Sequence, residues 1–160
     1  MADMLVKLYE LPPVHDRLVA LEEKGIVIKR PIGPENYAVI DWIRDNFVRI
    51  WAGESENAFF RSPRSIFVAT RGTEILGFAC YDATAKGFFG PTGVAKDERG
   101  QGIGAALLLS CLHAMRDEGY GYAIIGGVGP ADFYSKVCGA TMIENGGRGI
   151  YKDMLRAKSE

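Results

Sequence analysis

The chain has 160 residues, of which 48% are hydrophobic and 24% are charged, and its formal net charge is −1. A chain of this length buries roughly two-thirds of its unfolded surface as one compact domain, so we do not expect a second independent domain. The balanced charge and the absence of a long basic run argue against a nucleic acid or an anionic membrane surface as a partner. Small-molecule chemistry is the better expectation.

The cysteine content indicates a reducing compartment. Cys80, Cys111 and Cys138 are odd in number, widely spaced and embedded in apolar surroundings, which is typical of buried thiols rather than of a disulfide framework. None has a metal-type partner nearby, so we expect no metal site. The first residues lack a basic segment followed by an apolar stretch of signal length, and no run reaches the roughly 18 apolar residues of a membrane span. We therefore expect a cytoplasmic protein.

The first 64 residues predict a leader, two helices with a strand between them, and a mixed segment. Residues 1–13 are expected to be a short leader, and apolar residues then recur at helical spacing over residues 14–21. The β-branched stretch at residues 26–30 is typical of a strand. A core helix is predicted over residues 34–47. Residues 48–64 have mixed periodicity and large aromatics, so they are either a substrate wall or a second core-packing helix.

The second part of the chain predicts a sheet interrupted by helices, which gives a mixed α+β fold, mostly antiparallel. One extended segment carries Gly90-Pro91 in its middle, and since proline cannot donate to a strand ladder, we expect a bulge there. In chain order the expected elements are strands at residues 65–71, 74–82 and 87–96, a helix at 103–118, a strand at 122–125, a helix at 131–137 and a terminal β-hairpin over 140–155.

The stretch from Gly93 to Leu109 runs from an extended segment through glycines into an apolar helix. Gly100, Gly102 and Gly104 stand at every second position, which suits a turn whose backbone amides approach a ligand closely. A loop that opens a helix also presents unpaired N–H groups and the positive end of the helix dipole. The expected ligand is therefore an anion, and a phosphate in particular.

Three glycine-rich phosphate motifs compete for this loop. The Walker type requires Lys-Ser or Lys-Thr after its last glycine, and Ala105-Ala106 stands there instead. The dinucleotide fingerprint is formally matched, but its next strand has to end near a carboxylate for the ribose, and residues 124–127 carry none. The third type is Arg/Gln-x-x-Gly-x-Gly/Ala after a bulged strand, and the segment from Arg99 to Gly104, here named the glycine loop, fits it.

The glycine loop followed by an apolar helix resembles motif A of the GNAT N-acetyltransferase superfamily. A second segment, from Phe133 to Ala140, is similar to that family's later motif, in which an aromatic-Tyr pair on a short helix precedes the last strands. The resemblance covers about residues 26–155, which we expect to form the acetyltransferase domain. Residues 1–25 would be an N-terminal leader and helix, and residues 156–160 a polar tail.

The resemblance implies that the chain transfers an acyl group from acetyl-CoA, as co-substrate, directly to the amine of a small acceptor. A non-catalytic acyl-CoA-binding sensor or interaction module is the main alternative. A nicotinamide or flavin oxidoreductase is disfavoured by the missing ribose carboxylate. A homodimer is a further open possibility. The expected CoA-binding residues are Val94, Ala95, Lys96, Arg99, Gly100, Gln101, Gly102, Ile103, Gly104 and Ala105.

Tyr134 is the predicted general acid, placed to protonate the departing CoA thiolate. An amide between Gly93 and Ala95 is the candidate for polarising the thioester carbonyl. Family members often carry an asparagine upstream of the tyrosine, and here backbone amides of residues 126–130 are expected to replace it. The general base is left open among Glu54, Glu56, Asp82 and Tyr81. The candidate acceptor wall consists of Trp42, Trp51, Phe59, Phe60, Phe88 and Phe89, although such aromatics more often belong to a core.

Overall fold

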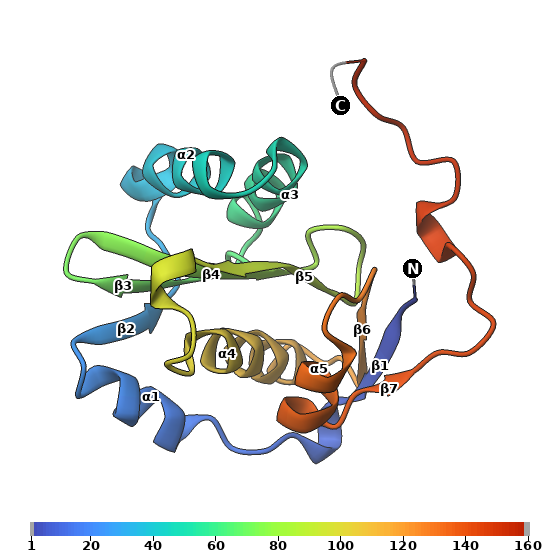
Figure 1. The fold of residues 1–160 in the computed structure, drawn as a ribbon, viewed down its shortest axis with the longest axis horizontal. Coiled ribbons are helices and arrows are strands. Elements are labelled where there is room, and N and C mark those ends of the chain that lie inside the picture. Colours follow the sequence, from blue (N-terminus) through green and yellow to red (C-terminus); the bar gives the residue numbers. More distant parts are fainter. Residues whose placement is uncertain (1, 159–160) are drawn as a thin grey trace.

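The computed structural model describes residues 2–158, and Figure 1 shows how they are arranged. The helices are α1 (His15–Glu22), α2 (Asn36–Asn46), α3 (Arg49–Phe59), α4 (Ile103–Asp117) and α5 (Ala131–Cys138). The strands are β1 (Met4–Lys7), β2 (Ile26–Lys29), β3 (Ile66–Arg71), β4 (Glu74–Tyr81), β5 (Phe88–Val94), β6 (Tyr122–Ile125) and β7 (Thr141–Met142). Two short 3-10 turns, η3 (Lys96–Glu98) and η4 (Gly149–Tyr151), lie near the site described below.

The strands form one sheet in the order β2-β3-β4-β5-β6-β1-β7. Neighbouring strands are antiparallel except β5 and β6, which are parallel. Helices α2 and α3 cover one face of the sheet, and α1, α4 and α5 lie on the other (Figure 1). The predicted mixed α+β, mostly antiparallel fold is therefore confirmed. Among the described residues, no helix is both long and apolar enough to cross a membrane.

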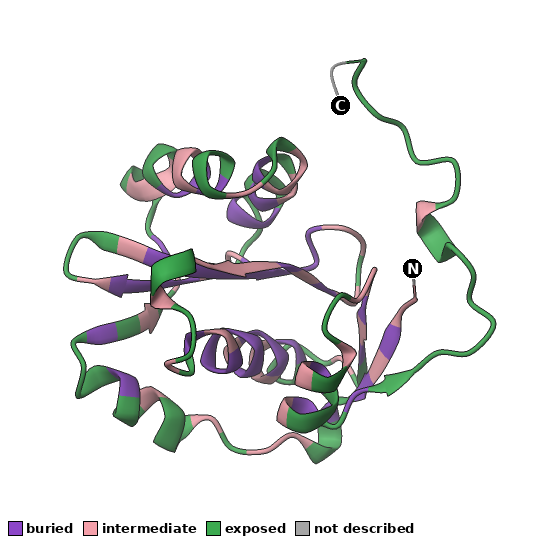
Figure 2. Cartoon of the chain, in the orientation of Figure 1, coloured by how far each residue is buried: buried purple, intermediate pink, exposed green. Residues whose placement is uncertain are grey.

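Helix α4 is the centre of the larger of two hydrophobic cores. Nine of its residues are buried, on more than one face, because Leu107 and its neighbours pack between the sheet and the helices beyond it. Figure 2 shows α4 as mostly purple, whereas the segment that ends at the C-terminus is mostly green. The smaller core lies on the opposite face, where Phe47, Trp51 and Phe78 stack with ring centroids 5.4–6.3 Å apart. Both faces of β4 are consequently buried.

Strand β5 is bulged at Gly90-Pro91, as the sequence predicts. Ala79 pairs with Thr92, whereas Tyr81 pairs with Phe89, so β5 contains one more residue than β4 between the two pairs. Gly93 allows the strand to approach the smaller core, because a Cβ there would lie 2.5 Å from the Phe47 ring. The bulge turns β5 away from its other neighbour.

Strands β5 and β6 are paired only where β5 begins and β6 ends. The paired positions are Phe88 with Ile124 and Phe89 with Ile125. Residues 90–94 of β5 extend beyond the end of β6, so the sheet splits there. The expected opening in the sheet is therefore present, and it lies beside the start of α4.

The expectation of a leader over residues 1–13 is wrong for residues 4–7. These residues form β1, which lies between β6 and β7 and is antiparallel to both. Met4 and Val6 are buried whereas Leu5 and Lys7 are more exposed, so the segment does alternate as a strand does. An alternation over four residues is too short to identify a strand from the sequence alone, because the neighbouring strands are known only from the fold. Residue 1 lies outside the described residues.

The predicted terminal β-hairpin is also wrong. Strand β7 has only two residues, and its partner is β1 rather than a later strand. Asn145, Gly147 and Gly149 all adopt positive φ, which interrupts an extended chain. Residues 143–158, here named the C-terminal arm, leave the sheet and contain only the turn η4. The predicted tail at residues 156–160 runs past residue 158, the last one described.

Candidate active site

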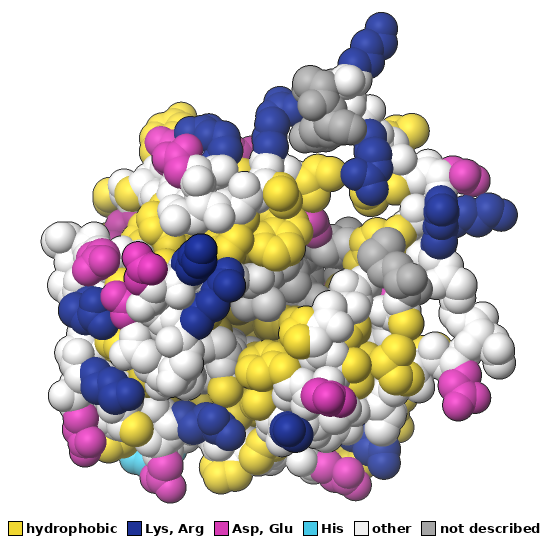
Figure 3. Space-filling model, in the orientation of Figure 1, with side chains coloured by type: hydrophobic (Ala, Val, Ile, Leu, Met, Phe, Trp, Pro, Cys, Tyr) yellow, Lys and Arg dark blue, Asp and Glu magenta, His cyan; other side chains and the backbone are white. Residues whose placement is uncertain are grey.

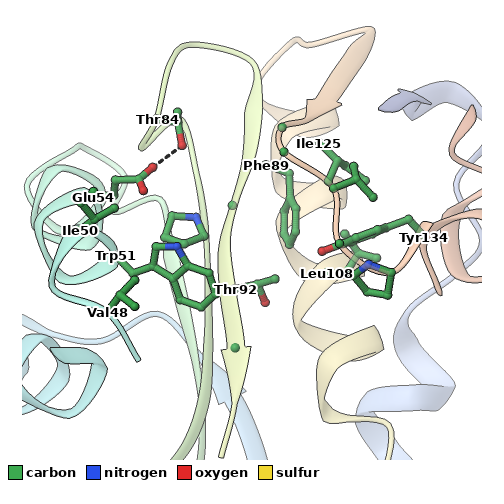
Figure 4. Close-up of a pocket in the computed structure, with 18 of the residues that line it drawn as sticks. Val48, Ile50, Trp51, Glu54, Thr84, Phe89, Thr92, Leu108, Ile125 and Tyr134 are labelled. Atoms are coloured by element: carbon green, nitrogen blue, oxygen red, sulfur yellow. Dashed lines mark hydrogen bonds between the residues drawn. The ribbon is translucent and has the colours of Figure 1, made fainter. Parts of the chain in front are cut away.

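A cavity of about 980 Å³ opens where β5 and β6 separate. Its walls come from α3, β5, the start of α4, the loop after β6, α5 and the C-terminal arm. Apolar side chains gather around the hollow on this face (Figure 3). In Figure 4, Glu54 and Trp51 project from α3 on one side of β5, and Tyr134 projects from the other side. A cavity of this size and lining is typical of small-molecule sites.

The glycine loop leads into α4 with two residues in the left-handed region. Gly100 has φ 84° and Gly102 has φ 89°. A Cβ at either position would meet no atom within 4 Å, so glycine is needed there for the backbone conformation and not for space. The first amides of α4 consequently point away from the helix as unpaired donors, which fits a phosphate.

A polar network fastens the glycine loop to the β3–β4 hairpin. The Arg71 guanidinium donates two hydrogen bonds to the Glu98 carboxylate, at 2.9 and 3.0 Å. Gln101 Nε2 donates to the same carboxylate at 2.6 Å and to the Glu98 carbonyl at 3.1 Å. The hydrogen bonds from Arg71 and then Gln101 lower the pKa of Glu98. The Gln101 side chain is therefore bound to Glu98, and its backbone amide is the group expected to contact a ligand.

The structure divides the predicted CoA-binding residues into two groups. Val94, Arg99 and Gly104 line the cavity. The Ala95 amide donates to the Leu76 carbonyl at 2.8 Å, so it is already paired within the sheet, and Ile103 is a core side chain. The other predicted residues are not among those that line the cavity: Ala95, Lys96, Gly100, Gln101, Gly102, Ile103 and Ala105. Their predicted roles depend on backbone groups.

Arg99 has a partner within the loop. Its Nε donates to the Val94 carbonyl at 3.2 Å. The side chain is exposed and lines the cavity. A guanidinium in this position suits a charge-assisted contact with a phosphate. The same hydrogen bond shows that the Val94 carbonyl is engaged before any ligand binds.

Tyr134 lies in a largely apolar part of the cavity. Its ring packs against Phe89 and Phe133, with centroids 6.3 and 5.1 Å apart. The hydroxyl points from α5 toward β5 (Figure 4). Burial, and then the nearby Cys138 thiol, raises the pKa of Tyr134 to about 12. The phenol therefore keeps its proton throughout the neutral pH range.

Glu54 is the one carboxylate among the described residues that line the cavity. Thr84 donates a hydrogen bond to it, which Figure 4 marks with a dashed line. Burial raises the pKa of Glu54 above its ordinary value, although the bond from Thr84 acts in the opposite direction. A desolvated carboxylate of this kind binds a proton or an ammonium group more strongly than an exposed one does.

The other candidate bases have different surroundings. Glu56 is exposed and is not part of the cavity wall. Asp82 is buried, and it accepts hydrogen bonds from the Tyr120 hydroxyl at 2.8 Å and the Gly87 amide at 2.7 Å. Tyr81 lies between Arg30 and Glu118, and burial followed by the bond to Glu118 raises its pKa. Only Glu54 of the four reaches the cavity.

The loop at residues 126–130 lines the cavity along its whole length. However, the Gly127 amide donates to the Asp3 carboxylate at 2.9 Å, and the Val128 amide donates to the Ala2 carbonyl at 2.8 Å. Pro130 has no amide hydrogen. The expectation that amides of this loop replace the family's asparagine is thus restricted to Gly126 and Gly129. The N-terminal segment supports the site by holding this loop.

The aromatic residues proposed as an acceptor wall are also divided. Trp51 and Phe89 line the cavity, whereas Trp42 and Phe59 belong to the smaller core and Phe60 is exposed. The sequence analysis missed Thr84 in the loop after β4, and Tyr151, Met154 and Arg156 in the C-terminal arm. The sequence predicts a hairpin strand at Tyr151 and Met154 and a polar tail at Arg156, and no signal in it marks the three as site residues.

Among the described residues, no group of three or more His, Cys, Asp or Glu side chains is placed to hold a metal ion. Cys138 is buried, and its Sγ lies 3.2 Å from the Tyr134 carbonyl. Burial raises the pKa of the Cys138 thiol to about 11. This setting favours a packed thiol over a nucleophile.

The model of the acetyltransferase (GNAT) family matches residues 36–140, which is more than half of the chain. The chain belongs to this family. The matched region begins at α2 and ends just before β7, so it contains both the glycine loop and Tyr134. The resemblance noted in the sequence is therefore confirmed. No curated protein matches the chain in sequence.

Solved structures share the fold. One is a GCN5-related glucosamine N-acetyltransferase region of a fungal multi-domain GH3 β-N-acetylglucosaminidase, with a TM-score of 0.71 and 17% identity over 89% of this chain and 19% of that one. A GCN5-related N-acetyltransferase from Sphaerobacter thermophilus gives a TM-score of 0.68 and 20% identity, over 89% and 48% of the two chains. One from Kribbella flavida gives 0.54 and 14%, over 88% and 53%. The chain therefore spans about half or less of each protein that it resembles, and identities this low support the fold alone.

Proposed function

We propose that the chain is an N-acetyltransferase that moves the acetyl group of acetyl-CoA to a primary amine of a small acceptor by direct attack. The observation that carries the proposal is a single cavity that reaches from the glycine loop to both Glu54 and Tyr134. Glu54 and Tyr134 lie on opposite sides of β5, at the point where the sheet splits. An acid and a base that face one cavity from two sides suit a transfer between two substrates.

In this proposal the pyrophosphate of CoA binds the unpaired amides at the start of α4. The amides from Gly100 to Ala105 supply N–H donors, and Arg99 adds a charge-assisted contact. Backbone groups of Val94 and Lys96 pair with the pantetheine arm along the split edge of β5, where a pantetheine amide replaces Arg99 Nε on the Val94 carbonyl. Because the Ala95 amide is paired with Leu76, the donor that polarises the thioester carbonyl is assigned to Gly93 or Val94.

Glu54 is the proposed general base and Tyr134 the proposed general acid. The amine nitrogen attacks the thioester carbonyl carbon, so that a C–N bond forms and the C–S bond breaks. An ammonium group first gives one proton to Glu54, directly or through one water molecule, and the neutral amine that results makes the attack. The second proton leaves the nitrogen for solvent by the same route, and the CoA sulfur receives the proton of Tyr134, which solvent then restores. The raised pKa of Glu54 makes it a stronger base than an exposed glutamate, and the raised pKa of Tyr134 keeps the acid protonated.

Two measurements test the proposed function. Acetyl-CoA is expected to raise the melting temperature of the protein, whereas NADH is not, because a ligand stabilises only the state that binds it. Release of free thiol from acetyl-CoA is then followed over a panel of primary amines, with an amine-free reaction as the control. Stabilisation without amine-dependent thiol release would contradict the transfer and favour an acyl-CoA-binding module. A cytoplasmic location remains part of the same proposal.

A further inference from the structure

The C-terminal arm closes one side of the cavity. Its residues Tyr151, Met154 and Arg156 line the same cavity as Glu54 and Trp51 of α3. The arm therefore borders the cavity that the Glu54 carboxylate lines.

Tyr151 is the point at which the arm docks on the body of the protein. It is the only residue of the arm that is not exposed. A Cβ at Gly126 would collide with the Tyr151 hydroxyl oxygen, so the ring occupies space that the glycine leaves open at the end of β6. Burial, and then the carboxylates of Asp3 and Glu54, raises the pKa of Tyr151 to about 12. Tyr151 is thus an uncharged, partly buried ring close to Glu54.

The rest of the arm is held mainly by its own turns. The Ile143 amide donates to the Asp3 carbonyl at 2.9 Å where the arm leaves the sheet. Beyond that point the backbone hydrogen bonds around η4 are local, for example from the Tyr151 amide to the Arg148 carbonyl at 3.0 Å. Tyr151, and Gly149 where it approaches the Asp3 carboxylate, are two of the points at which the arm lies against the body of the protein.

The lining near Glu54 combines apolar surface with one carboxylate, and the cations Arg49 and Arg156 also line the cavity. Trp51, Tyr151 and Met154 supply aromatic and thioether surface, and Glu54 is the one carboxylate of the lining among the described residues. Arg156 is exposed, so its charge lies at the rim. An ammonium group is favoured beside a desolvated carboxylate, and an aromatic or aliphatic body is favoured against the rings.

We propose that the C-terminal arm is the specificity-determining wall of the acceptor site, with Tyr151 contacting the body of an apolar primary amine whose nitrogen lies at Glu54. This proposal rests on the proposed acetyl transfer and names the class of its acceptor. The acceptor carries one amine on an uncharged apolar group. Neither a second ammonium nor a carboxylate suits the surface that Tyr151 and Trp51 provide.

The test compares two amines in the full chain. 2-Phenylethylamine has an apolar body, and ethanolamine has almost none, so wild type is expected to prefer the former by kcat/KM. Tyr151→Ala removes an aromatic contact and is expected to raise KM for 2-phenylethylamine roughly tenfold. KM for ethanolamine and for acetyl-CoA should change less than about twofold, since neither substrate contacts the ring.

Three further variants separate this role from a general loss of structure. Tyr151→Phe keeps the ring and should behave as wild type. Gly126→Ala displaces the ring without altering it and should reproduce the loss of amine preference. Leu155→Ala, at a residue of the arm that is 94% exposed and outside the cavity, should change nothing. Melting temperatures show whether each variant folds. If Tyr151→Ala does not fold, Gly126→Ala still tests the role of the ring.

The outcomes distinguish the two proposals. If wild type releases no thiol with any amine, the proposed function fails, and the acceptor class fails with it. If wild type transfers acetyl groups but Tyr151→Ala and Gly126→Ala leave the amine preference unchanged, only the role of the arm is overturned. Preference of wild type for phenylalanine or putrescine over 2-phenylethylamine would overturn the apolar acceptor, because these carry the carboxylate and the second amine.

Discussion

The two ends of the cavity differ in how the chain builds them. The end at the glycine loop comes from one continuous stretch, β5 through the start of α4, and its proposed ligand contacts are mainly backbone groups. The end at Glu54 combines α3, the loop after β4 and the C-terminal arm, and its proposed contacts are side chains. A backbone site needs glycines at fixed spacing, which a sequence displays. A side-chain site needs segments that meet only in the folded protein.

This difference predicts how the two ends respond to substitution. Changes at Tyr134 and Glu54, where bonds are proposed to break and protons to move, should act on kcat. Changes around the glycine loop should act on KM for acetyl-CoA. The predictions below follow this contrast from the largest expected effect to the smallest.

Tyr134→Phe is expected to lower kcat by about 10³-fold, since a positioned general acid contributes roughly 10²–10⁴-fold. Loss of the hydroxyl leaves the ring and its packing on Phe89 and Phe133 in place. Binding of CoA, measured by titration calorimetry, should therefore be unchanged. Tyr37→Phe is the matched control, because Tyr37 is 79% exposed and outside the cavity. An unchanged kcat in Tyr134→Phe would remove this tyrosine from the mechanism.

Glu54→Gln is expected to lower kcat by about 10²-fold, the lower range for a general base. Glu56→Gln is the control, because Glu56 lies on the same helix but is exposed and outside the cavity. In wild type the acid limb of the pH–kcat profile should lie above the ordinary pKa of a glutamate, because burial raises the pKa of Glu54. Glu54→Gln should lose this limb. If Glu54→Gln and Glu56→Gln are equally active, Glu54 is not the general base, and water is the remaining proton acceptor.

The same carboxyl gives a stability prediction with a definite sign. Because the pKa of Glu54 is higher in the folded than in the unfolded chain, the folded protein binds more protons between the two values. Wild-type stability should therefore fall, relative to Glu54→Gln, as the pH rises from the ordinary glutamate pKa through the raised one. Chemical denaturation at several pH values measures this difference. A wild-type protein that instead gained stability over this range would contradict a desolvated Glu54.

The sequence predicted most of the fold, because most elements carry local signals. Helix α4 has apolar residues on several faces, and the bulge of β5 is marked by Gly90-Pro91. The two errors, at β1 and at the C-terminal arm, concern segments whose state depends on a distant partner. Strand β1 is a strand because β6 and β7 lie on either side of it.

The candidate site was predictable to the extent that it consists of backbone. The glycine loop and its place at the start of α4 follow from glycine spacing, whereas the choice of Glu54 over Glu56 does not. Those two carboxylates lie two residues apart on α3, and only the packing of that helix decides which one faces the cavity. Tyr151 could not be found at all, because its position depends on the space that Gly126 leaves at the end of β6.

The smallest expected effect tests how the glycine loop is held. Glu98→Gln removes the charge that Arg71 and Gln101 bind, and KM for acetyl-CoA should rise only about threefold, because ion pairs that solvent screens contribute little. The pKa of Glu98 is lowered by its partners, so its stabilisation is lost only as the pH falls through that lowered value, and the effect on KM should be constant at neutral pH. Glu74→Gln is the control, because Glu74 also pairs with Arg71, at 3.7 Å, but does not contact the loop. If KM changes equally in both variants, the contribution comes from Arg71 and not from fastening the glycine loop; if kcat falls instead, the separation between the two ends of the cavity is wrong.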